Sequence, residues 1–421
     1  MLCRSITAQG MIVCVPLGEV AIPMRNRINR FVQSALRRGT TELLPGVAKS
    51  LLKAWTSEPV YPIIIQMEPT RRCNLRCVMC ALTQFYHKER APDMSLDEFK
   101  HVVSQFPGDA EQITIQGTGE PLLNKDIIEM IEFARARGFR THFNTNLIPL
   151  TDEMAERLVA AGHDEVMVSI ETTNPERYAD IRRNASIERF LENMGKLARA
   201  KERAGTTHPK ITACSILMKH TLEDIPEMVS VLKSFGVVRL HFADMCTYPE
   251  HDGPLTLADG TDLRDQALGA TMSQDEIWEE VAKIKALEDE TFELTVPGEW
   301  GDLKMEKSND GRVLTCKELW RLPFVKPDST LATCCWAPQF VMGDFKTQSF
   351  REIWFGEQYR DMRLKHLTNR HPDHCRQCQQ LMYTVAQPSR IFGPAPEGHP
   401  TDEVFMWRSI PTHVLGDTPG K

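Results

Sequence analysis

Short apolar runs alternate with amphipathic stretches over residues 62–246, and this pattern predicts repeated strand–helix units. The helical stretches, such as SLDEFKHVVSQF, NKDIIEMIEFARARG and TDEMAERLVAAG, carry apolar residues at helical spacing. Ser95, Asn124 and Thr151 are expected to cap helix N-termini. The predicted strands cover residues 63–68, 113–116, 141–145, 165–170, 211–217 and 237–243.

The apolar strands of these repeats predict a parallel sheet covered by helices, which places the chain in the α/β class. A closed barrel of this kind needs eight strands. Because six are predicted, we expect an open, partial (β/α)6 TIM-like barrel. A later stretch with several cysteines predicts a small C-terminal α+β module.

Composition shifts divide the chain into five segments. We expect a helical N-terminal lead-in at 1–60, the partial barrel at 61–246, a turn-rich connector at 247–310, the cysteine-bearing module at 311–383 and a proline-rich tail at 384–421. Within the lead-in, residues 24–55 have an apolar helical face and an arginine-rich face. Such a helix packs on the main domain with its charged face in solvent, or contacts an acidic partner or a membrane surface.

The composition is that of a globular protein: 421 residues, 42% hydrophobic and 25% charged. The 50 basic and 57 acidic residues give a net charge of −7, so charge gives no reason to expect nucleic acid. We find no secretory signal and no transmembrane segment, and we expect a cytoplasmic protein. In a reducing compartment, the clustering of many of the 12 cysteines predicts metal binding.

The first cysteine cluster, CxxxCxxC at Cys73, Cys77 and Cys80, follows the first predicted barrel strand. Loops at this end of barrel strands build active sites. Three thiolates suit three irons of a [4Fe-4S] cluster and leave the fourth iron open, as a catalytic centre requires. A structural zinc is the alternative, but it needs a fourth ligand nearby, and the nearest histidine is His87.

This motif, placed after the first strand of a βα barrel, resembles the signature of the radical S-adenosylmethionine (SAM) superfamily over about residues 60–246. The sequence Thr118-Gly119-Glu120 resembles the family's Gly-Gly-Glu motif with its first glycine replaced. The resemblance implies SAM contacts from Met79, Gly119, Glu120, Asn146, Ser169 and Arg182. Glu120 would accept from the SAM ammonium group and Arg182 would face its carboxylate; the alternative for Arg182 is a surface arginine.

The family's chemistry would then apply to this chain. The resemblance implies that a reduced [4Fe-4S] cluster cleaves SAM to a 5′-deoxyadenosyl radical, which takes a hydrogen atom from a substrate. It also implies an electron donor such as flavodoxin or ferredoxin.

A second set of cysteines lies near the C-terminus: Cys316, Cys334 or Cys335, Cys375 and Cys378. Neighbouring residues on a strand face opposite sides, so one of Cys334 and Cys335 is expected to face the metal. The set resembles a twitch module, a shortened SPASM extension of radical SAM enzymes, and this spacing favours Cys334. Four thiolates would saturate an auxiliary [4Fe-4S] cluster; a structural zinc is the alternative.

Our leading hypothesis is a radical SAM oxidoreductase that dehydrogenates a small polar metabolite, with the auxiliary cluster as electron acceptor. The alternatives are a maturase that modifies a peptide or protein side chain, a radical epimerase, and a non-catalytic metal-binding regulatory protein. The sequence does not name the substrate, because loop variation lets one barrel host many reactions.

Overall fold

The computed structural model of the protein describes the barrel region and much of the cysteine-bearing module. The described residues are 5–8, 11–14, 61–62, 64–80, 82–83, 91–106, 110–243, 245, 256–296, 313–316, 318–367, 370–376 and 381–384.

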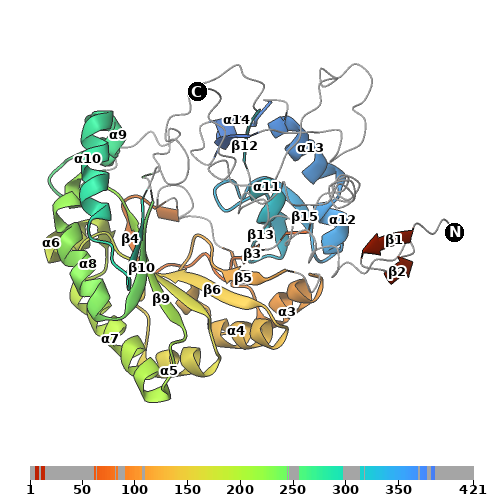
Figure 1. Ribbon diagram of the computed structural model, residues 1–421, viewed down its shortest axis with the longest axis horizontal. Helices are drawn as coiled ribbons and strands as arrows, with labels where there is room; N and C mark the ends of the chain where they lie inside the picture. Colours follow the sequence, from red (N-terminus) through yellow and green to blue (C-terminus); the bar gives the residue numbers. More distant parts are fainter. Residues whose placement is uncertain are drawn as a thin grey trace.

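A ten-stranded sheet forms the centre of the molecule, in the order β11-β10-β9-β7-β6-β5-β3-β13-β14-β15 (Figure 1). Its strands are β3 (Ile64–Met67), β5 (Gln112–Ile115), β6 (Arg140–Thr145), β7 (Glu165–Ser169), β9 (Lys210–Ile216), β10 (Val237–Ala243), β11 (Glu293–Thr295), β13 (Phe324–Val325), β14 (Thr330–Ala332) and β15 (Val341–Asp344). All neighbours from β11 to β13 are parallel. The six predicted strands are therefore confirmed.

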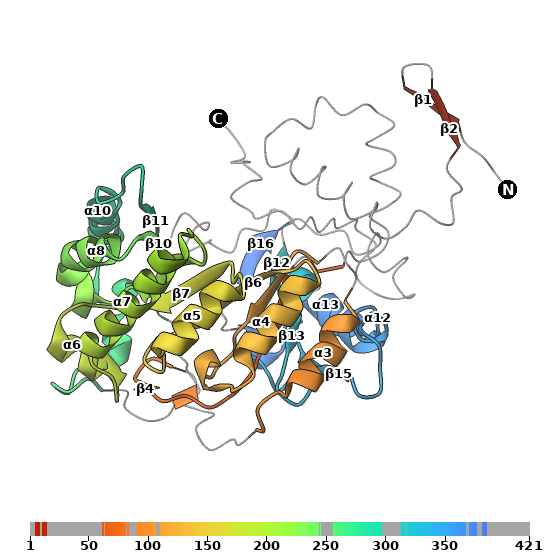
Figure 2. The same cartoon turned by 90° about the horizontal axis from the view of Figure 1, so that it is seen from below.

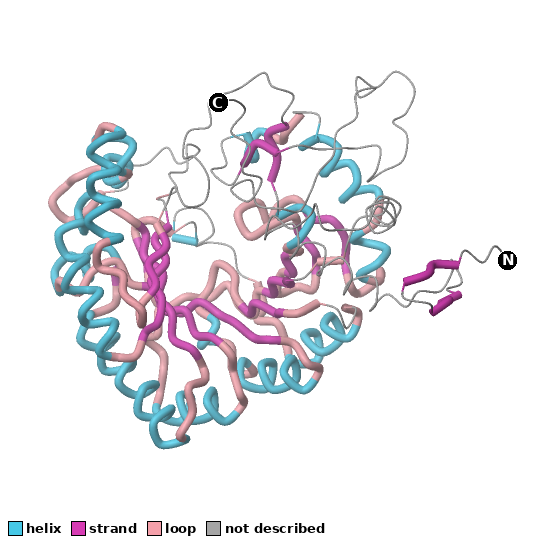
Figure 3. Tube along the Cα trace, in the orientation of Figure 1, coloured by secondary structure: helices cyan, strands magenta, loops and turns pink. Residues whose placement is uncertain are grey.

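The sheet is curved and open, which confirms the predicted partial barrel. Strands β11 and β15 form its two edges, and the described chain does not join them. Strand β11, from the connector segment, adds a further parallel strand beside β10. Figure 3 shows the strands on the inside of the arc and the helices on its outside.

Helices α3 to α8 cover the outer face of the sheet. They are α3 (Leu96–Ser104), α4 (Ile127–Ala136), α5 (Asp152–Ala160), α6 (Pro175–Ile181), α7 (Ile187–Ala204) and α8 (Ile225–Ser234). Figure 2 shows α3, α4, α5 and α7 side by side. The connector adds α9 (Leu268–Thr271) and α10 (Gln274–Lys285). Short 3-10 segments lie at η3 (Pro121–Leu123), η4 (Lys219–Asp224) and η5 (Leu263–Gln266).

Two of the three predicted caps are confirmed. The hydroxyl of Ser95 accepts from the Glu98 N–H in a capping box, and that of Thr151 accepts from the Met154 N–H. Asn124 does not cap α4, whose N-cap is Asp126 without a side-chain bond. Its buried amide instead donates to the carbonyls of Pro69 and Met94, at 2.8 and 2.9 Å, because the loop after β3 passes beside it.

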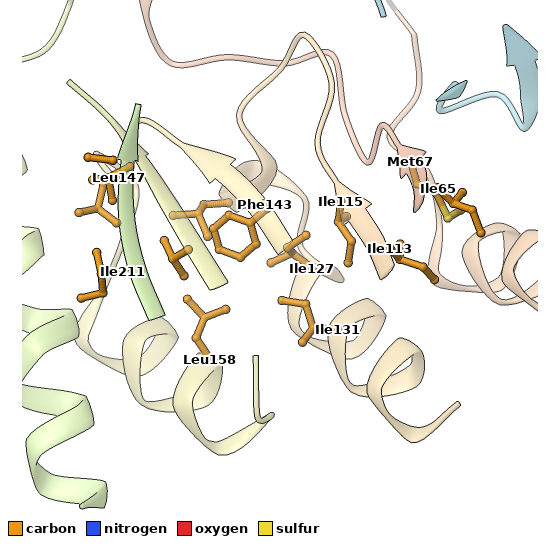
Figure 4. Packing of buried hydrophobic residues seen from close by; sticks show 14 of the residues in the cluster. Ile65, Met67, Ile113, Ile115, Ile127, Ile131, Phe143, Leu147, Leu158 and Ile211 are labelled. Carbon is orange, nitrogen blue, oxygen red and sulfur yellow. The ribbon is translucent and has the colours of Figure 1, made fainter. Parts of the chain in front are cut away.

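The core lies between the sheet and the outer helices. Alternate strand residues such as Ile113, Ile115 and Phe143 are fully buried against the helices, where Ile131 and Leu158 meet them (Figure 4). The strand residues between them are therefore left to face the inner side of the arc.

The cysteine-bearing module continues the main sheet. Its elements outside the sheet are β12 (Val313–Cys316), α11 (Glu318–Arg321), α12 (Phe350–Trp354), α13 (Glu357–Leu367), α14 (Asp373–Arg376) and β16 (Leu381–Thr384). Strands β13 and β14 form the hairpin predicted around residues 327–329, and β13 pairs in parallel with β3. The rings of Phe350 in α12 and Phe106 lie 4.6 Å apart, so the module is packed against the barrel.

Within the lead-in, the described residues differ from the expected helix. Strands β1 (Ser5–Ala8) and β2 (Met11–Cys14) form an antiparallel hairpin. Both segments carry β-branched residues, which favour strands. The helix expected within 24–55 and the tail at 384–421 lie outside the described residues, apart from Thr384. None of the helices in the described ranges is long and apolar enough to cross a membrane.

Candidate active site

The loop after β3 brings Cys73, Cys77 and Cys80 together at the carboxyl end of the sheet. Cys77 lies in β4 (Arg76–Cys77), which pairs with β8 (Arg182–Arg183) so that Cys77 lies opposite Arg182. The Cys80 N–H donates to the Cys77 carbonyl at 3.2 Å. All three thiols are half-buried, and Cys73 and Cys80 are close enough to act electrostatically on Cys77.

Burial keeps two of these thiols protonated when no metal is bound. It raises the pKa of Cys73 to about 11 and that of Cys77 to about 12. The charge of Arg182 acts in the opposite direction on Cys77. Metal binding therefore has to release protons from these thiols.

Nitrogen donors point at the sulfurs, as the residues around a bound thiolate would. The Leu75 N–H lies 3.5 Å and the Asn146 amide nitrogen 3.8 Å from Cys73 Sγ. Arg182 Nη1 lies 3.9 Å from Cys77 Sγ. Donors of this kind stabilise anionic sulfur, so the loop fits a thiolate-bound iron–sulfur cluster.

Among the described residues, no three His, Cys, Asp or Glu side chains converge on a point where they could hold one metal ion. A cubane cluster takes one thiolate at each iron. It therefore needs thiols spaced around a cluster rather than meeting at a single ion.

Two glycines let the loop after β5 pack against the cysteine loop. A Cβ on Gly119 would lie 2.3 Å from the Thr70 carbonyl oxygen and 2.7 Å from that of Arg72. A Cβ on Gly117 would lie 2.3 Å from the side chain of Glu68. The glycines thus serve close backbone approach, here to the cysteine loop itself.

Glu120 has a buried carboxylate with three donors around it. Oε1 accepts from the Thr145 hydroxyl at 2.6 Å and the Leu122 N–H at 3.2 Å, and Oε2 accepts from the Asn146 N–H at 2.8 Å. Burial raises its pKa to about 7 although these bonds oppose the shift. The Glu120 N–H donates to the Arg72 carbonyl at 2.8 Å, which joins the two loops.

Arg182 is not a surface residue. It is 5% exposed, and its Nε and Nη2 donate to the two carboxylate oxygens of Glu171 at 2.5 and 2.7 Å. This bidentate pair holds β8 beside Cys77 and leaves Nη1 toward that thiol.

The two remaining predicted SAM contacts lie near this site. Met79 is buried in a small apolar cluster with Ile181 and Met218. Ser169 is half-buried at the end of β7, in register with Cys214 of β9. Glu120, Asn146, Arg182 and the three cysteines are thus joined by contacts, and Met79 shares their loop.

The inner face of the sheet carries many polar side chains beside apolar ones such as Ile64, Met167 and Ile216. Between the core positions, the strands carry Gln66, Thr114, Gln116, His142, Asn144, Glu165, Thr212, Arg239, His241 and Thr295. Many of these side chains are only half-buried. We call this group the inner-face set.

The inner-face set is linked across the strands. His142 Nε2 lies 2.8 Å from Asn144 Oδ1, and the Thr212 hydroxyl donates to Glu165 Oε1 at 2.8 Å. His142 Nδ1 lies 3.8 Å from Glu165 Oε2. The nearby imidazole of His142 is the main reason that the pKa of Glu165 is lowered to about 2.

Three cysteines of the second set lie in described parts of the module. Cys316 ends β12, Cys334 follows β14 and Cys375 lies in α14, all half-buried. Cys378 lies outside the described residues. Burial raises the pKa of Cys335, whose thiol contacts the side chain of Gln66 on the barrel side.

Sequence reasoning missed Glu68. Its fully buried carboxylate accepts from the Thr118 N–H and hydroxyl, both at 2.6 Å, and from Arg71 Nε at 3.0 Å. A possible signal was a glutamate at the end of a buried strand, directly before the cysteine loop. Its partners come from the next strand's loop, which sequence spacing does not reveal.

Comparisons with known proteins agree with this geometry. Residues 67–232 match the radical SAM superfamily, and residues 310–379 match the SPASM iron-sulfur cluster-binding domain. Residues 67–232 thus form a radical SAM domain, and residues 310–379 form a SPASM-type iron-sulfur module. The cofactors of the chain are SAM, a catalytic [4Fe-4S] cluster and an auxiliary cluster.

Individual relatives cover part of the chain. The tungsten-containing aldehyde ferredoxin oxidoreductase cofactor-modifying protein of Pyrococcus furiosus is 30% identical over 176 residues, 41% of this chain and 49% of that protein. Mycofactocin maturase MftC of Mycolicibacterium smegmatis is 26% identical over 178 residues, 42% of this chain and 43% of that protein. The matches thus span half or less of these relatives' length.

A solved structure shares the fold over most of the chain. Streptococcus suis SuiB bound to S-adenosylmethionine superposes with a TM-score of 0.57 at 14% identity, over 80% of this chain and 78% of that one.

Proposed function

We propose that this radical SAM enzyme oxidises a polar substrate bound on the inner face of the sheet. The observation that carries the proposal is the inner-face set, whose hydroxyl, amide, imidazole and charged groups suit a polar molecule.

The proposed ligands are those expected from the sequence. Cys73, Cys77 and Cys80 would hold the catalytic cluster, and Cys316, Cys334, Cys375 and Cys378 the auxiliary one. Met79, Gly119, Glu120, Asn146, Ser169 and Arg182 would surround SAM. When bound, SAM and the catalytic cluster would supply a hydrogen-abstracting radical, and the auxiliary cluster would supply a site for a second electron.

The residues of this chain have to take up the proton that such an oxidation releases. When an alcohol carbon loses a hydrogen atom and then an electron, the proton of its hydroxyl group still has to be removed. The imidazole of His142 can accept that proton, and the ionised carboxylate of Glu165 beside it stabilises the resulting charge.

Peptide modification is the second candidate. It is favoured by the sequence similarity to a maturase and by the fold shared with SuiB. A structure of SuiB bound to the precursor peptide SuiA has also been solved. As the source of electrons we propose a flavodoxin or ferredoxin. A reducing cytoplasm is the proposed location, since it would preserve the thiols.

The test uses reconstituted protein, SAM and dithionite under anaerobic conditions, with pools of polar metabolites and of peptides. We expect substrate-dependent 5′-deoxyadenosine together with a small-molecule product lighter by two hydrogen atoms. A product of unchanged mass would indicate epimerisation, and turnover with peptides alone would favour the second candidate.

Variants connect that product to the inner-face set. Replacing His142 with Ala or Glu165 with Gln should slow product formation about a hundredfold, the typical contribution of a positioned acid or base. The matched control, Glu227→Gln, removes the same charge from the exposed outer side of α8. Normal turnover in both inner-face variants would contradict their assigned role.

A further inference from the structure

A buried stripe on α13 carries polar groups whose partners are incomplete. Tyr359, Arg363 and His366 lie at helical spacing and therefore share one side of the helix. Tyr359 and Arg363 are 0% exposed and His366 is 1% exposed. We call these three residues the α13 stripe.

Arg363 brings a positive charge into this interior. Its Nε donates to the Leu319 carbonyl at 3.0 Å and its Nη1 to the Trp354 carbonyl at 2.8 Å. The rings of Trp354 and Tyr359 lie 4.3 and 4.6 Å from the guanidinium carbon. No carboxylate among the described residues forms an ion pair with Arg363, and its Nη2 has no hydrogen-bond partner there.

His366 shows the same deficit. Within the described ranges, neither of its ring nitrogens has a hydrogen-bond partner. The ring of His371 packs edge-on against it, with centroids 4.6 Å apart. Buried cations and buried N–H groups without acceptors are costly, so an anionic acceptor beside the stripe would lower this cost.

The stripe lies between segments that carry proposed cluster ligands. Leu319, which accepts from Arg363, lies in α11, three residues after Cys316. The Tyr359 hydroxyl donates to the Ala332 carbonyl at 3.2 Å. Burial raises the pKa of Tyr359, and a smaller contribution from Cys334 indicates that this cysteine lies nearby.

We infer that Arg363 and His366 face the auxiliary [4Fe-4S] cluster and raise its reduction potential. The inference rests on the ligand set given under the proposed function. A cluster held by thiolates is anionic, and its sulfurs accept hydrogen bonds. A buried positive charge and N–H···S bonds both favour the reduced, more negative state.

The experiment uses the full chain with Cys73, Cys77 and Cys80 changed to Ala, so that only the auxiliary cluster is reconstituted. Its midpoint potential is measured by redox titration with electron paramagnetic resonance. Arg363→Met should lower the equilibrium constant for reduction of the cluster at least about tenfold. For a one-electron couple this corresponds to a midpoint potential lower by about 59 mV. Arg363→Lys keeps the charge, so it should lower the potential by less than half as much as Arg363→Met does.

The matched control is Arg360→Met, which removes an exposed cation from the same helix and should leave the potential unchanged. A purely structural role for Arg363 would lower the melting temperature without moving the potential. His366→Phe provides the second test, because it removes the unpartnered nitrogens and should also lower the potential.

Unchanged potentials in folded, cluster-loaded Arg363→Met and His366→Phe proteins would overturn the inference. If Arg363→Met does not load the cluster, the potential of His366→Phe decides. Failure of the proposed ligand set looks different, since the parent protein with the three alanines would then contain no auxiliary cluster. The reaction itself is not involved in this measurement.

Discussion

At the scale of single residues, Gly119 determines how closely two loops approach. Its replacement by Ala should displace the cysteine loop, because a Cβ would lie 2.3 Å from the Thr70 carbonyl oxygen. We expect iron to fall from about eight to about four per chain as the catalytic cluster is lost, and SAM cleavage to fall about a hundredfold.

The control for this variant is Gly269→Ala, where an added Cβ would meet no atom within 4 Å. It should keep full iron content and SAM cleavage. Full iron and normal cleavage in the Gly119→Ala protein would show that the contact is not needed.

Glu120 makes stability depend on pH. Its pKa is raised from 4.5 to about 7 by burial, so the folded state binds the proton more tightly than the unfolded state does. Its contribution to stability is therefore present below about pH 4.5 and is lost as the pH rises through about 7. The full effect is on the order of 3 kcal/mol.

The measurement is the melting temperature of wild-type and Glu120→Gln protein between about pH 5 and 7.5. The wild-type value should fall more steeply as the pH rises, because Gln does not ionise. Parallel curves would mean that Glu120 has an ordinary pKa in the folded protein.

At the scale of elements, the pairing of β13 with β3 joins the iron–sulfur module to the barrel. Val325 is fully buried at this junction, and its carbonyl accepts from the Glu68 N–H at 2.8 Å. Val325→Asp should destabilise the protein by about 3 to 5 kcal/mol, because it buries an unpaired carboxylate.

The same change at Val341 is the control, since that residue is 40% exposed on edge strand β15. Thermal unfolding should show a large decrease for Val325→Asp and a small one for Val341→Asp. Equal decreases in melting temperature would indicate that the junction contributes no more to stability than the exposed edge strand does.

At the scale of the whole molecule, the two clusters should have separable roles. Cys375→Ala should remove the auxiliary cluster and leave the catalytic one, so iron should fall by about half. SAM cleavage should persist while oxidised product is lost, because the second electron then has no acceptor.

This measurement pairs 5′-deoxyadenosine with product, on protein shown to be folded by circular dichroism. The exposed Asp373→Ala variant, in the same short helix, is the control. A folded Cys375→Ala protein without the auxiliary cluster that makes product at the normal ratio would eliminate the electron-acceptor role.

The sequence by itself determined the elements and the class of chemistry. Strand periodicity predicted the six parallel strands, because alternation and apolar runs are local consequences of burial. The CxxxCxxC spacing indicated an open iron–sulfur site, since ligands within one loop are close in sequence. The hairpin at 327–329 followed from turn residues.

Only the tertiary structure decided how separate segments meet. Three contacts join residues that are far apart in sequence or lie on different elements. They are the pairing of β13 with β3, the approach of Gly119 to Thr70 and the Arg182–Glu171 pair. Sheet register brings the polar side chains of the inner face together, and packing of α13 against Leu319 and Trp354 buries Arg363. Local spacing specifies which residues share an element's face, whereas strand order and packing decide what that face contacts.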